Sequence, residues 1–286
     1  MHNNQRIWIL RDTYEPKEGP YLSAHVDVLV QGAQQLSLPM IEANIDAIDG
    51  MHPHDLILFR PTQDGELRRS FIHKIKACSG HSINKHASFV STKQSFFKLA
   101  TALHIPIPKT WTGLIFQRIQ PTSQTGFVVK TSKGSQGTGV FFCDTTRQVI
   151  KKIRALQVPV VVQEFIPLDT IEDIRLLMVG TTLCAAMKRV VQAEHTGEFR
   201  ANISLGSAKP LPYVPTEEMI SYAQQIMRHT QLDFAGIDLL VHNDKPLFLE
   251  CNTRPGLHGI IKTDASIGTR AIQLLLSRAM SSSRSS

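Results

Sequence analysis

The 286-residue sequence lacks the patterns that mark secreted, membrane-spanning and zinc-binding proteins. Its four cysteines form no CxxC pair and no Cys/His spacing of a metal site, so we expect reduced, buried thiols without disulfides. No signal-peptide pattern follows Met1, and no apolar run approaches the ~20 residues of a membrane span. These absences predict a soluble, cytoplasmic protein that does not enter membranes.

Sequence signatures of two nucleotide-binding folds are missing as well. The N-terminal region has no GxGxxG motif, so nothing argues for a dinucleotide there, and no GK(S/T) opens a helix as in a P-loop. Although the formal net charge is +7, there is no Lys/Arg block, and aromatic residues are only 7 %. The charge therefore favours a small-anion site, and we do not expect nucleic acid to bind. An RNA- or ribosome-associated protein is the alternative that the charge leaves open.

The chain does have the composition of a soluble globular protein, with 42 % hydrophobic and 19 % charged residues. Its length predicts about two domains. The first, residues 1–80, alternates strands predicted at residues 7–10 and 55–60 with helices predicted at residues 23–36 and 67–78. Strands that alternate with helices predict an α/β unit with a largely parallel sheet.

Two apolar runs, residues 236–241 and 247–251, flank a turn-rich segment and predict a β-hairpin. On the second strand Glu250 and Asn252 lie two residues apart, so they share a face, and Asp238 of the first strand can come level with them. Two carboxylates and an amide oxygen at one point are ligands that Mg²⁺ prefers when it accompanies a nucleoside triphosphate. The spacing alone leaves open that Asp238 and Glu250 are solvated strand carboxylates.

A second candidate site is the glycine-rich loop at residues 131–139, between strands predicted at residues 127–130 and 140–142. Three glycines let backbone N–H groups approach an anion, and Lys130 and Lys133 add positive charge. The loop therefore predicts a phosphate-binding segment, with a flexible hairpin tip as the alternative.

The remaining sequence predicts further strands and helices, some with polar faces. Asp173 and Arg175 lie two apart on one strand face, and Arg200 and Asn202 repeat that spacing. Thr216 is the expected N-cap of a helix. The predicted strands are residues 158–166, 173–180 and 181–190, the predicted helices are residues 91–104, 148–156, 217–229 and 268–280, and residues 281–286 are an expected disordered tail.

Eight motifs stand in a characteristic order: Lys93, Val129-Lys130 with the loop Gly134-Ser135-Gln136-Gly137-Thr138-Gly139-Val140, Val162-Gln163-Glu164-Phe165-Ile166, Asp173-Ile174-Arg175, Phe199-Arg200-Ala201-Asn202, Ala235-Gly236-Ile237-Asp238, Glu250-Cys251-Asn252 and Pro255-Gly256-Leu257-His258-Gly259-Ile260. In this set the chain resembles the ATP-grasp superfamily, and within it the RimK-like carboxylate–amine ligases. The resemblance implies an α/β ATP-grasp domain at residues 81–280, with a small lobe at 81–162 and a C-terminal lobe at 163–280. Residues 1–80 then form the smaller α/β domain that precedes the grasp.

The resemblance also implies a role for each motif. ATP would be held by the phosphate-binding residues Lys93, Lys130, Gly134, Gln136 and Gly137 and by the nucleotide-binding residues Gln163, Glu164, Phe165, Ile166 and Asp173. The metal ion, Mg²⁺ with Mn²⁺ as an alternative, would be ligated by Asp238, Glu250 and Asn252.

Catalysis in such a ligase depends on positioning and charge stabilisation more than on an enzyme nucleophile. The resemblance implies that a substrate carboxylate attacks the γ-phosphate to give an acyl phosphate, which an amine then converts to an amide. Arg175, Arg200 and Asn202 would face the transferred phosphoryl group as the catalytic residues. His258 is the alternative phosphoryl acceptor, because it follows the metal hairpin closely.

Cations near the expected site also predict the class of substrate. Lys188, Arg189, Arg200 and Arg254 favour an acidic amine such as glutamate, since arginine pairs with carboxylates in a bidentate manner. The expected partners are a carboxylate donor and an amine acceptor, each an amino acid, a peptide or a small molecule, and a homo-oligomer is left open. The alternatives are an ATP-grasp ligase for other small acids and amines, or a nucleotide-binding regulator without turnover.

Overall fold

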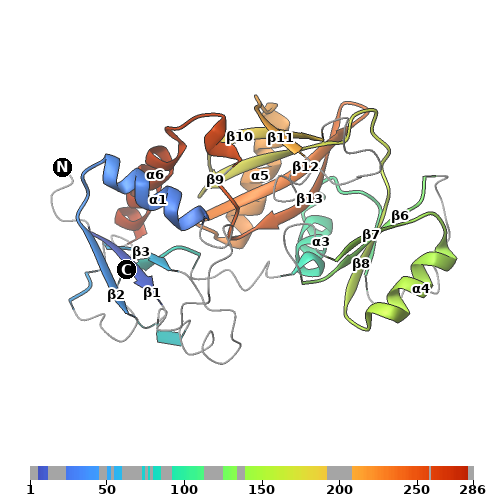
Figure 1. Ribbon diagram of the computed structural model, residues 1–286, viewed down its shortest axis with the longest axis horizontal. Coiled ribbons are helices and arrows are strands. Elements are labelled where there is room, and N and C mark those ends of the chain that lie inside the picture. Colours follow the sequence, from blue (N-terminus) through green and yellow to red (C-terminus); the bar gives the residue numbers. More distant parts are fainter. Residues whose placement is uncertain are drawn as a thin grey trace.

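The computed structural model describes residues 6–11, 24–44, 50–52, 55–59, 73–74, 77, 80–84, 92–112, 125–133, 139–191, 208–257 and 259–282. Within them, the strands form three sheets that follow one another along the long axis of the molecule (Figure 1). A four-stranded N-terminal sheet lies at one end, a five-stranded sheet in the middle and a second four-stranded sheet at the other end.

The N-terminal sheet has the parallel α/β organisation that the alternating strands and helices predict. Its strands, in the order β2-β1-β3-β4, are β1 (Ile7–Arg11), β2 (Met40–Asn44), β3 (Leu56–Phe59) and β4 (His81–Ser82), and all neighbours pair in parallel. The helix α1 (Ala24–Gln35) connects β1 to β2. Two strands have no clear signal in the sequence: the alternation of β2 is brief, and β4 is too short to give a pattern. The helix predicted at residues 67–78 lies largely outside the described residues.

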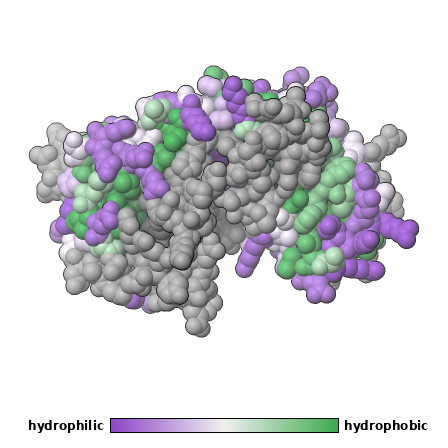
Figure 2. Space-filling view, in the orientation of Figure 1, coloured by the Kyte–Doolittle hydropathy of each residue, from purple (hydrophilic) through white to green (hydrophobic). Residues whose placement is uncertain are grey.

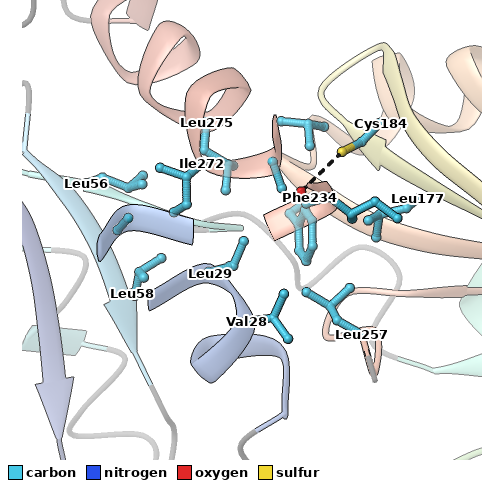
Figure 3. Packing of buried hydrophobic residues seen from close by; sticks show 14 of the residues in the cluster. Val28, Leu29, Leu56, Leu58, Leu177, Cys184, Phe234, Leu257, Ile272 and Leu275 are labelled. Carbon is cyan, nitrogen blue, oxygen red and sulfur yellow. Dashed lines mark hydrogen bonds between the residues drawn. The ribbon is translucent and has the colours of Figure 1, made fainter. Parts of the chain in front are cut away.

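One hydrophobic core joins the N-terminal sheet to the end of the chain (Figure 3). The last helices are η4 (Ile260–Lys262) and α6 (Ile267–Ser282). Leu29 of α1, Leu56 of β3 and Leu275 of α6 are buried in the same cluster as Leu177 and Phe234 of the middle sheet. The chain therefore returns to its own beginning, and the N-terminal sheet is fixed to the sheet that carries the predicted metal hairpin.

The middle sheet is antiparallel and has different chemistry on its two faces. Its strands, in the order β11-β10-β9-β12-β13, are β9 (Glu172–Val179), β10 (Thr182–Val191), β11 (Ala208–Pro212), β12 (Phe234–His242) and β13 (Lys245–Asn252). The helices α3 (Lys93–Ala102) and α5 (Glu217–Thr230) cover one face through a core that includes Phe96, Ile226 and Ile237. The opposite face meets the α6 core at one end of the strands and carries charged residues at the other.

Local signals in the middle sheet agree with the sequence analysis. The predicted hairpin is confirmed as β12 and β13, joined at Asn243 and Asp244, whose φ angles of +50° and +60° are those that asparagine and aspartate tolerate best. Thr216 caps α5 as predicted, since its side chain accepts a hydrogen bond from the N–H of Met219. The prediction of a tail from residue 281 is corrected: α6 continues to Ser282, because no glycine or proline ends it at residue 280.

The third sheet holds the strand that ends in Lys130. It consists of β5 (Thr110–Thr112), β6 (Phe127–Thr131), β7 (Val140–Cys143) and β8 (Val160–Glu164), in the order β5-β8-β6-β7. The helix α4 (Thr146–Leu156) covers one face, where Val149 packs with Phe127 and Val129. Strand alternation turns Lys130 to the opposite face.

The surface at the α4 end carries both hydrophilic and hydrophobic residues (Figure 2). Arg147, Lys151 and Arg154 are exposed on this helix. Among the helices that the structure describes, none has both the length and the apolar character needed to cross a membrane.

Replacing Gly32 by alanine is expected to destabilise the packing of α1 on α6. A Cβ at this position would lie 2.4 Å from the backbone carbon of Gly268, so the two helices would have to move apart. Overpacking of this kind costs about 1–3 kcal/mol, against which the better helix propensity of alanine returns about 1 kcal/mol. Urea unfolding of Gly32→Ala should show a lower free energy of unfolding, with the exposed Gln34→Ala in the same helix as the control. A stability above that of the wild type would contradict this account.

Candidate active site

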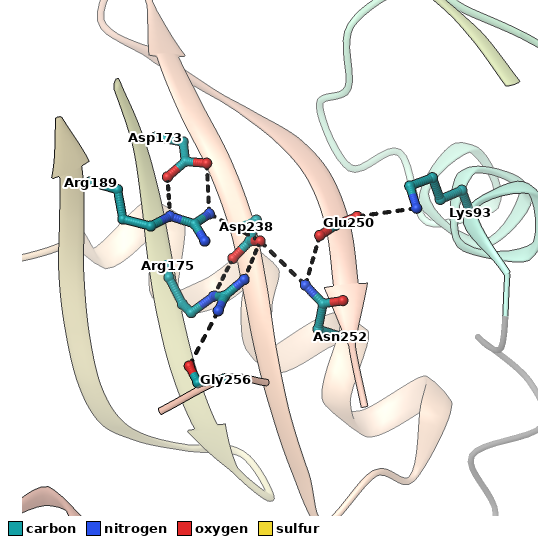
Figure 4. A network of polar contacts seen from close by, with 8 residues as sticks. All are labelled: Lys93, Asp173, Arg175, Arg189, Asp238, Glu250, Asn252 and Gly256. Atoms are coloured by element: carbon teal, nitrogen blue, oxygen red, sulfur yellow. Dashed lines mark hydrogen bonds and ion pairs between the residues drawn. The ribbon is translucent and has the colours of Figure 1, made fainter. Parts of the chain in front are cut away.

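The predicted metal ligands meet on one face of the β12–β13 hairpin (Figure 4). Asp238 lies directly opposite Glu250, and Asn252 lies opposite Gly236, so strand alternation turns Asp238, Glu250 and Asn252 to the same side. Nδ2 of Asn252 donates to Oε1 of Glu250 at 2.7 Å and to Oδ2 of Asp238 at 3.3 Å. Cys251, between the two ligands, points into the core behind them as predicted, where burial raises the pKa of its thiol to about 12.

Asp238 is held by an arginine on the neighbouring strand. Arg175 of β9 lies opposite Asp238, and its Nε and Nη2 donate to Oδ1 and Oδ2 of that carboxylate at 2.7 Å and 2.6 Å. Nη1 of Arg175 also donates to the carbonyl of Gly256 at 3.4 Å, which links β9 to the loop after β13. Gly236 leaves room for Pro255 of this loop, because a Cβ there would lie 2.7 Å from Cβ of Pro255, whereas its distances of 3.4 Å to Cδ and Nε of Arg175 are ordinary contacts.

A second arginine extends the network to β10. Arg189 lies opposite Asp173, and its Nε and Nη2 both donate to that carboxylate, the latter at 2.6 Å. Nη2 of Arg189 also lies 3.1 Å from Oδ2 of Asp238. Two aspartates and two arginines thus alternate across three strands, with each charge facing opposite charges (Figure 4).

The pKa values of this network follow from burial and pairing. Burial alone would raise the pKa of Asp238, but Arg175 and Arg189 hold it well below its ordinary value. Burial raises the pKa of Asp173 to about 6, although the charge of Arg189 opposes this effect. Burial would lower the pKa of Arg189, yet Asp173 and Asp238 raise it. Asp238 and Arg189 are therefore ionised throughout the physiological pH range.

Two lysines face this carboxylate cluster from the other side of the site. Lys93 begins α3 directly after Thr92, which caps the helix in a capping box with Ser95, and its Nζ lies 3.7 Å from Oε2 of Glu250. The N–H of Lys93 donates to the carbonyl of Ser132, so α3 is attached to the end of β6. Burial lowers the pKa of Lys130 to about 8, and the charge of Lys93 adds to this while that of Glu250 opposes it. The two lysines therefore act on one carboxylate.

Four of the residues predicted to bind the nucleotide lie where β8 ends. The N–H of Glu164 donates to the carbonyl of Lys109, and the N–H of Phe165 donates to that of Gly126. Gln163 is buried on the sheet face of Lys130, and its Nε2 donates to Oγ1 of Thr110. Ile166 follows these residues directly. A nucleotide base bound at this edge would meet backbone groups, some of which already form hydrogen bonds to neighbouring segments of the protein.

The predicted substrate cations are not all brought together. Lys188 lies on the sheet face opposite to Arg189, and its Nζ pairs with Glu172 Oε2 at 3.1 Å. The expectation that Lys188 and Arg189 act in one cluster is thus corrected, because consecutive strand residues point to opposite faces. Arg254 is exposed in the loop after β13. The predicted site residues that lie outside the described residues are Gly134, Gln136, Gly137, Arg200, Asn202 and His258.

Two contributors to the site were missed by the sequence analysis. Gly236 had been quoted only as part of a motif, and the carbonyl of Gly256 had no assigned role. The Gly-x-Asp spacing of Gly236 and Asp238 was an available signal, since a glycine inside a strand often marks the close approach of another part of the chain, here Pro255.

The chemistry of the candidate ligands fits Mg²⁺. No group of three His, Cys, Asp or Glu residues converges within the described part of the chain, so a cation here would need the amide oxygen of Asn252 with Asp238 and Glu250. Oδ2 of Asp238 has three donors within hydrogen-bonding distance, whereas Oδ1 receives one hydrogen bond and keeps a lone pair for a metal ion. The three candidate ligands, Asp238, Glu250 and Asn252, would each bind the metal ion through an oxygen atom, as Mg²⁺ prefers.

Comparison with known proteins decides the family. The RimK-like ATP-grasp domain matches residues 109–275, which is more than half of the chain. The chain belongs to the RimK-like ATP-grasp family. This membership confirms the resemblance on which the sequence analysis relied.

Curated relatives of this RimK-like chain carry the description "Probable alpha-L-glutamate ligase". Those from Pseudomonas putida GB-1 and Stutzerimonas stutzeri A1501 are each 37 % identical to it, over 145 and 139 residues. The matches cover 50 % and 48 % of this chain and 47 % and 45 % of the relatives. The chain thus spans about half the length of the curated relatives that it matches.

Solved structures confirm the ATP-grasp fold of this RimK-like chain. The ATP-grasp ligase PsnB, in complex with minimal precursor, Mg and ADP, superposes with a TM-score of 0.72 at 12 % identity, covering 96 % of this chain and 97 % of PsnB. D-alanine–D-alanine ligase from Bacillus anthracis with ATP gives 0.70 at 12 % identity and 99 % of each chain. The macrocyclase MdnC of Microcystis aeruginosa, bound to precursor peptide MdnA, gives 0.65 at 16 % identity, covering 95 % and 99 %.

Lys130 is expected to react with acylating reagents at a lower pH than other lysines do. Its pKa of about 8 leaves a large neutral fraction at pH 8, and only the neutral amine is nucleophilic. Competitive labelling followed by mass spectrometry should give a midpoint near pH 8 for Lys130, with exposed Lys133 as the internal reference. Because the cationic form attracts phosphate, ATP affinity should weaken as the pH rises through this midpoint. A labelling midpoint above pH 10 would refute the assignment.

Proposed function

We propose that this chain is an ATP-dependent carboxylate–amine ligase that forms an amide bond through an acyl phosphate. The observation that carries the proposal is the meeting of Lys93 and Glu250 at 3.7 Å, with Lys130 beside them. Phosphate-binding cations and oxygen ligands for a metal thereby face each other across one site. Membership of the RimK-like ATP-grasp family supports this reading of the site.

The two lysines are suited to hold the phosphates of ATP. Lys93 is the first residue of α3, so a bound phosphate also lies near the helix N-terminus, where the helix dipole favours anions. Lys130 is partly buried, and a charge that has already lost water interacts more strongly with a phosphate than an exposed one does. Both contacts fix the triphosphate relative to Glu250.

Asp238, Glu250 and Asn252 would hold Mg²⁺, or Mn²⁺ in its place. When bound, the ion neutralises charge on the phosphate oxygens and favours departure of ADP. The protein's own contribution is to keep these ligands in place: Arg175 fixes Asp238, and Asn252 donates hydrogen bonds to both carboxylates. PsnB, which shares the fold, has been solved with Mg and ADP.

The reaction needs positioning of two substrates and no protein nucleophile. A carboxylate oxygen of the donor attacks the γ-phosphorus, the bond to the bridging oxygen breaks, and ADP leaves. The amine nitrogen then attacks the acyl carbon, the C–O bond to phosphate breaks, and the nitrogen loses a proton. Charge develops on phosphate oxygens in both steps, which is where Lys93 and Lys130 stabilise it.

Glutamate is the proposed amine, and a peptide or amino-acid carboxylate is the proposed donor. The curated relatives are described as probable alpha-L-glutamate ligases, which supports an acidic acceptor. PsnB and MdnC, which share the fold, were solved with the precursor peptides PsnA2 and MdnA, which supports a peptide as partner. Arg254, exposed in the loop whose Gly256 carbonyl Arg175 binds, is the described cation proposed to meet an incoming carboxylate.

Glu250→Gln is expected to lower turnover by at least about 100-fold, because it removes one metal ligand charge while keeping the side chain's shape. Phosphate release should be measured with ATP, Mg²⁺, glutamate and a series of peptide carboxylates, and hydroxylamine should trap the acyl phosphate as a hydroxamate. Glu218→Gln, an exposed carboxylate on α5, is the matched control. Retention of turnover in Glu250→Gln would exclude the metal assignment, and phosphate release that no amine stimulates would exclude the ligase.

A further inference from the structure

The two oxygens of Asp238 have unequal surroundings. Oδ1 accepts one hydrogen bond, from Nε of Arg175 at 2.7 Å. Oδ2 receives Nη2 of Arg175 at 2.6 Å and Nδ2 of Asn252 at 3.3 Å, and Nη2 of Arg189 lies 3.1 Å away. Since Asp238 is only 3 % exposed, these side chains and not water determine the carboxylate's orientation.

Arg189 is itself firmly held. It is 6 % exposed, and its Nε and Nη2 both donate to Asp173 on the strand beside it. Removing a buried charge from its partner leaves the partner unpaired and is strongly unfavourable. If Arg189 turned toward an incoming substrate, the buried carboxylates of Asp173 and Asp238 would both lose the cation that they share. Arg189 is therefore expected to stay in place.

We propose that Arg189 is a positioning residue for the metal site of the proposed function, on which this inference rests. It contacts Oδ2 of Asp238, the oxygen that Asn252 also reaches, and thereby fixes the orientation of this carboxylate toward the cation, while Asp173 is the counter-ion that fixes Arg189. This role differs from the substrate contact and the nucleotide contact that the sequence analysis expected for Arg189 and Asp173.

Two simpler roles for Arg189 make opposite predictions. If it were only a nearby positive charge, its removal would strengthen binding of a divalent cation, because like charges repel. If it bound the carboxylate of the amine substrate, its removal would raise the KM for that substrate and leave cation affinity unchanged. A positioning residue instead weakens cation binding when its geometry is lost, even if its charge is kept.

The test uses Mn²⁺ as the probe in titrations of the full chain followed by electron paramagnetic resonance, with and without a non-hydrolysable ATP analogue. Arg189→Lys keeps the charge but loses the planar fork, and it should weaken Mn²⁺ binding about 10- to 100-fold. Affinity for the analogue at saturating Mn²⁺ should change less than about twofold. Lys209→Gln, an exposed cation on β11, is the control and should bind Mn²⁺ as the wild type does.

A companion variant guards against loss of folding. Asp173→Asn with Arg189→Gln removes one charge of each sign, so no buried charge is left without a partner, and circular dichroism should report a wild-type fold. It should also bind Mn²⁺ at least about 10-fold more weakly than the wild type.

Each other outcome overturns the inference in a distinguishable way. Wild-type or tighter Mn²⁺ affinity in Arg189→Lys and in the double variant would refute positioning while leaving the proposed ligase intact. A higher KM for the amine with unchanged Mn²⁺ affinity would make Arg189 a substrate-binding residue. Failure of the wild-type protein to bind Mn²⁺ under either condition would remove the metal site of the proposed function and this inference together.

Discussion

The ion pair between Arg175 and Asp238 is the constraint on which the rest of the site depends. Both side chains are buried, and burying a charge is costly unless its partners are close and well oriented. The bidentate geometry and the flanking pair of Arg189 with Asp173 meet that condition. If the pairing of β9 and β12 slipped by one residue, Arg175 or Asp238 would turn toward the apolar core under α3 and α5 and lose its partner. The ion pair therefore also fixes the register of the sheet.

The register in turn explains how one face of the sheet serves two purposes. Toward one end of β9 and β12, Leu177 and Phe234 join the core that α1 and α6 close over. Toward the other end, the same face carries Arg175 and Asp238. The apolar half fixes the strands in a rigid scaffold, and this rigidity lets the polar half hold its charges with little reorganisation.

Sequence reasoning reached those parts of the site that depend on local pattern. The hairpin follows from two apolar runs around a short turn, and it is present in the structure, but the pairing of Asp238 with Glu250 also depends on a register shift between Asp238 and Leu239. The sheet faces of Lys188 and Arg189 could not be predicted from local pattern. A register shift between Leu183 and Ala185 places an extra residue in β10, and without it simple alternation from the turn would have put Lys188 on the site face. A one-residue bulge leaves no clear mark in the sequence.

The charges of the described site explain why a metal ion is expected to accompany the nucleotide. The seven charged side chains comprise four cations and three anions, and they are Lys93, Lys130, Arg175, Arg189, Asp173, Asp238 and Glu250. Both arginines are already neutralised by aspartates, so only the two lysines are directed at a ligand, and Glu250 offsets part of their charge. A triphosphate brings more negative charge than this small surplus can balance. The carboxylates that offset the charge of the lysines are also the groups that can bind a metal cation, and this cation would balance the triphosphate. The +7 net charge of the whole chain does not replace the metal cation, because distant surface charges are screened.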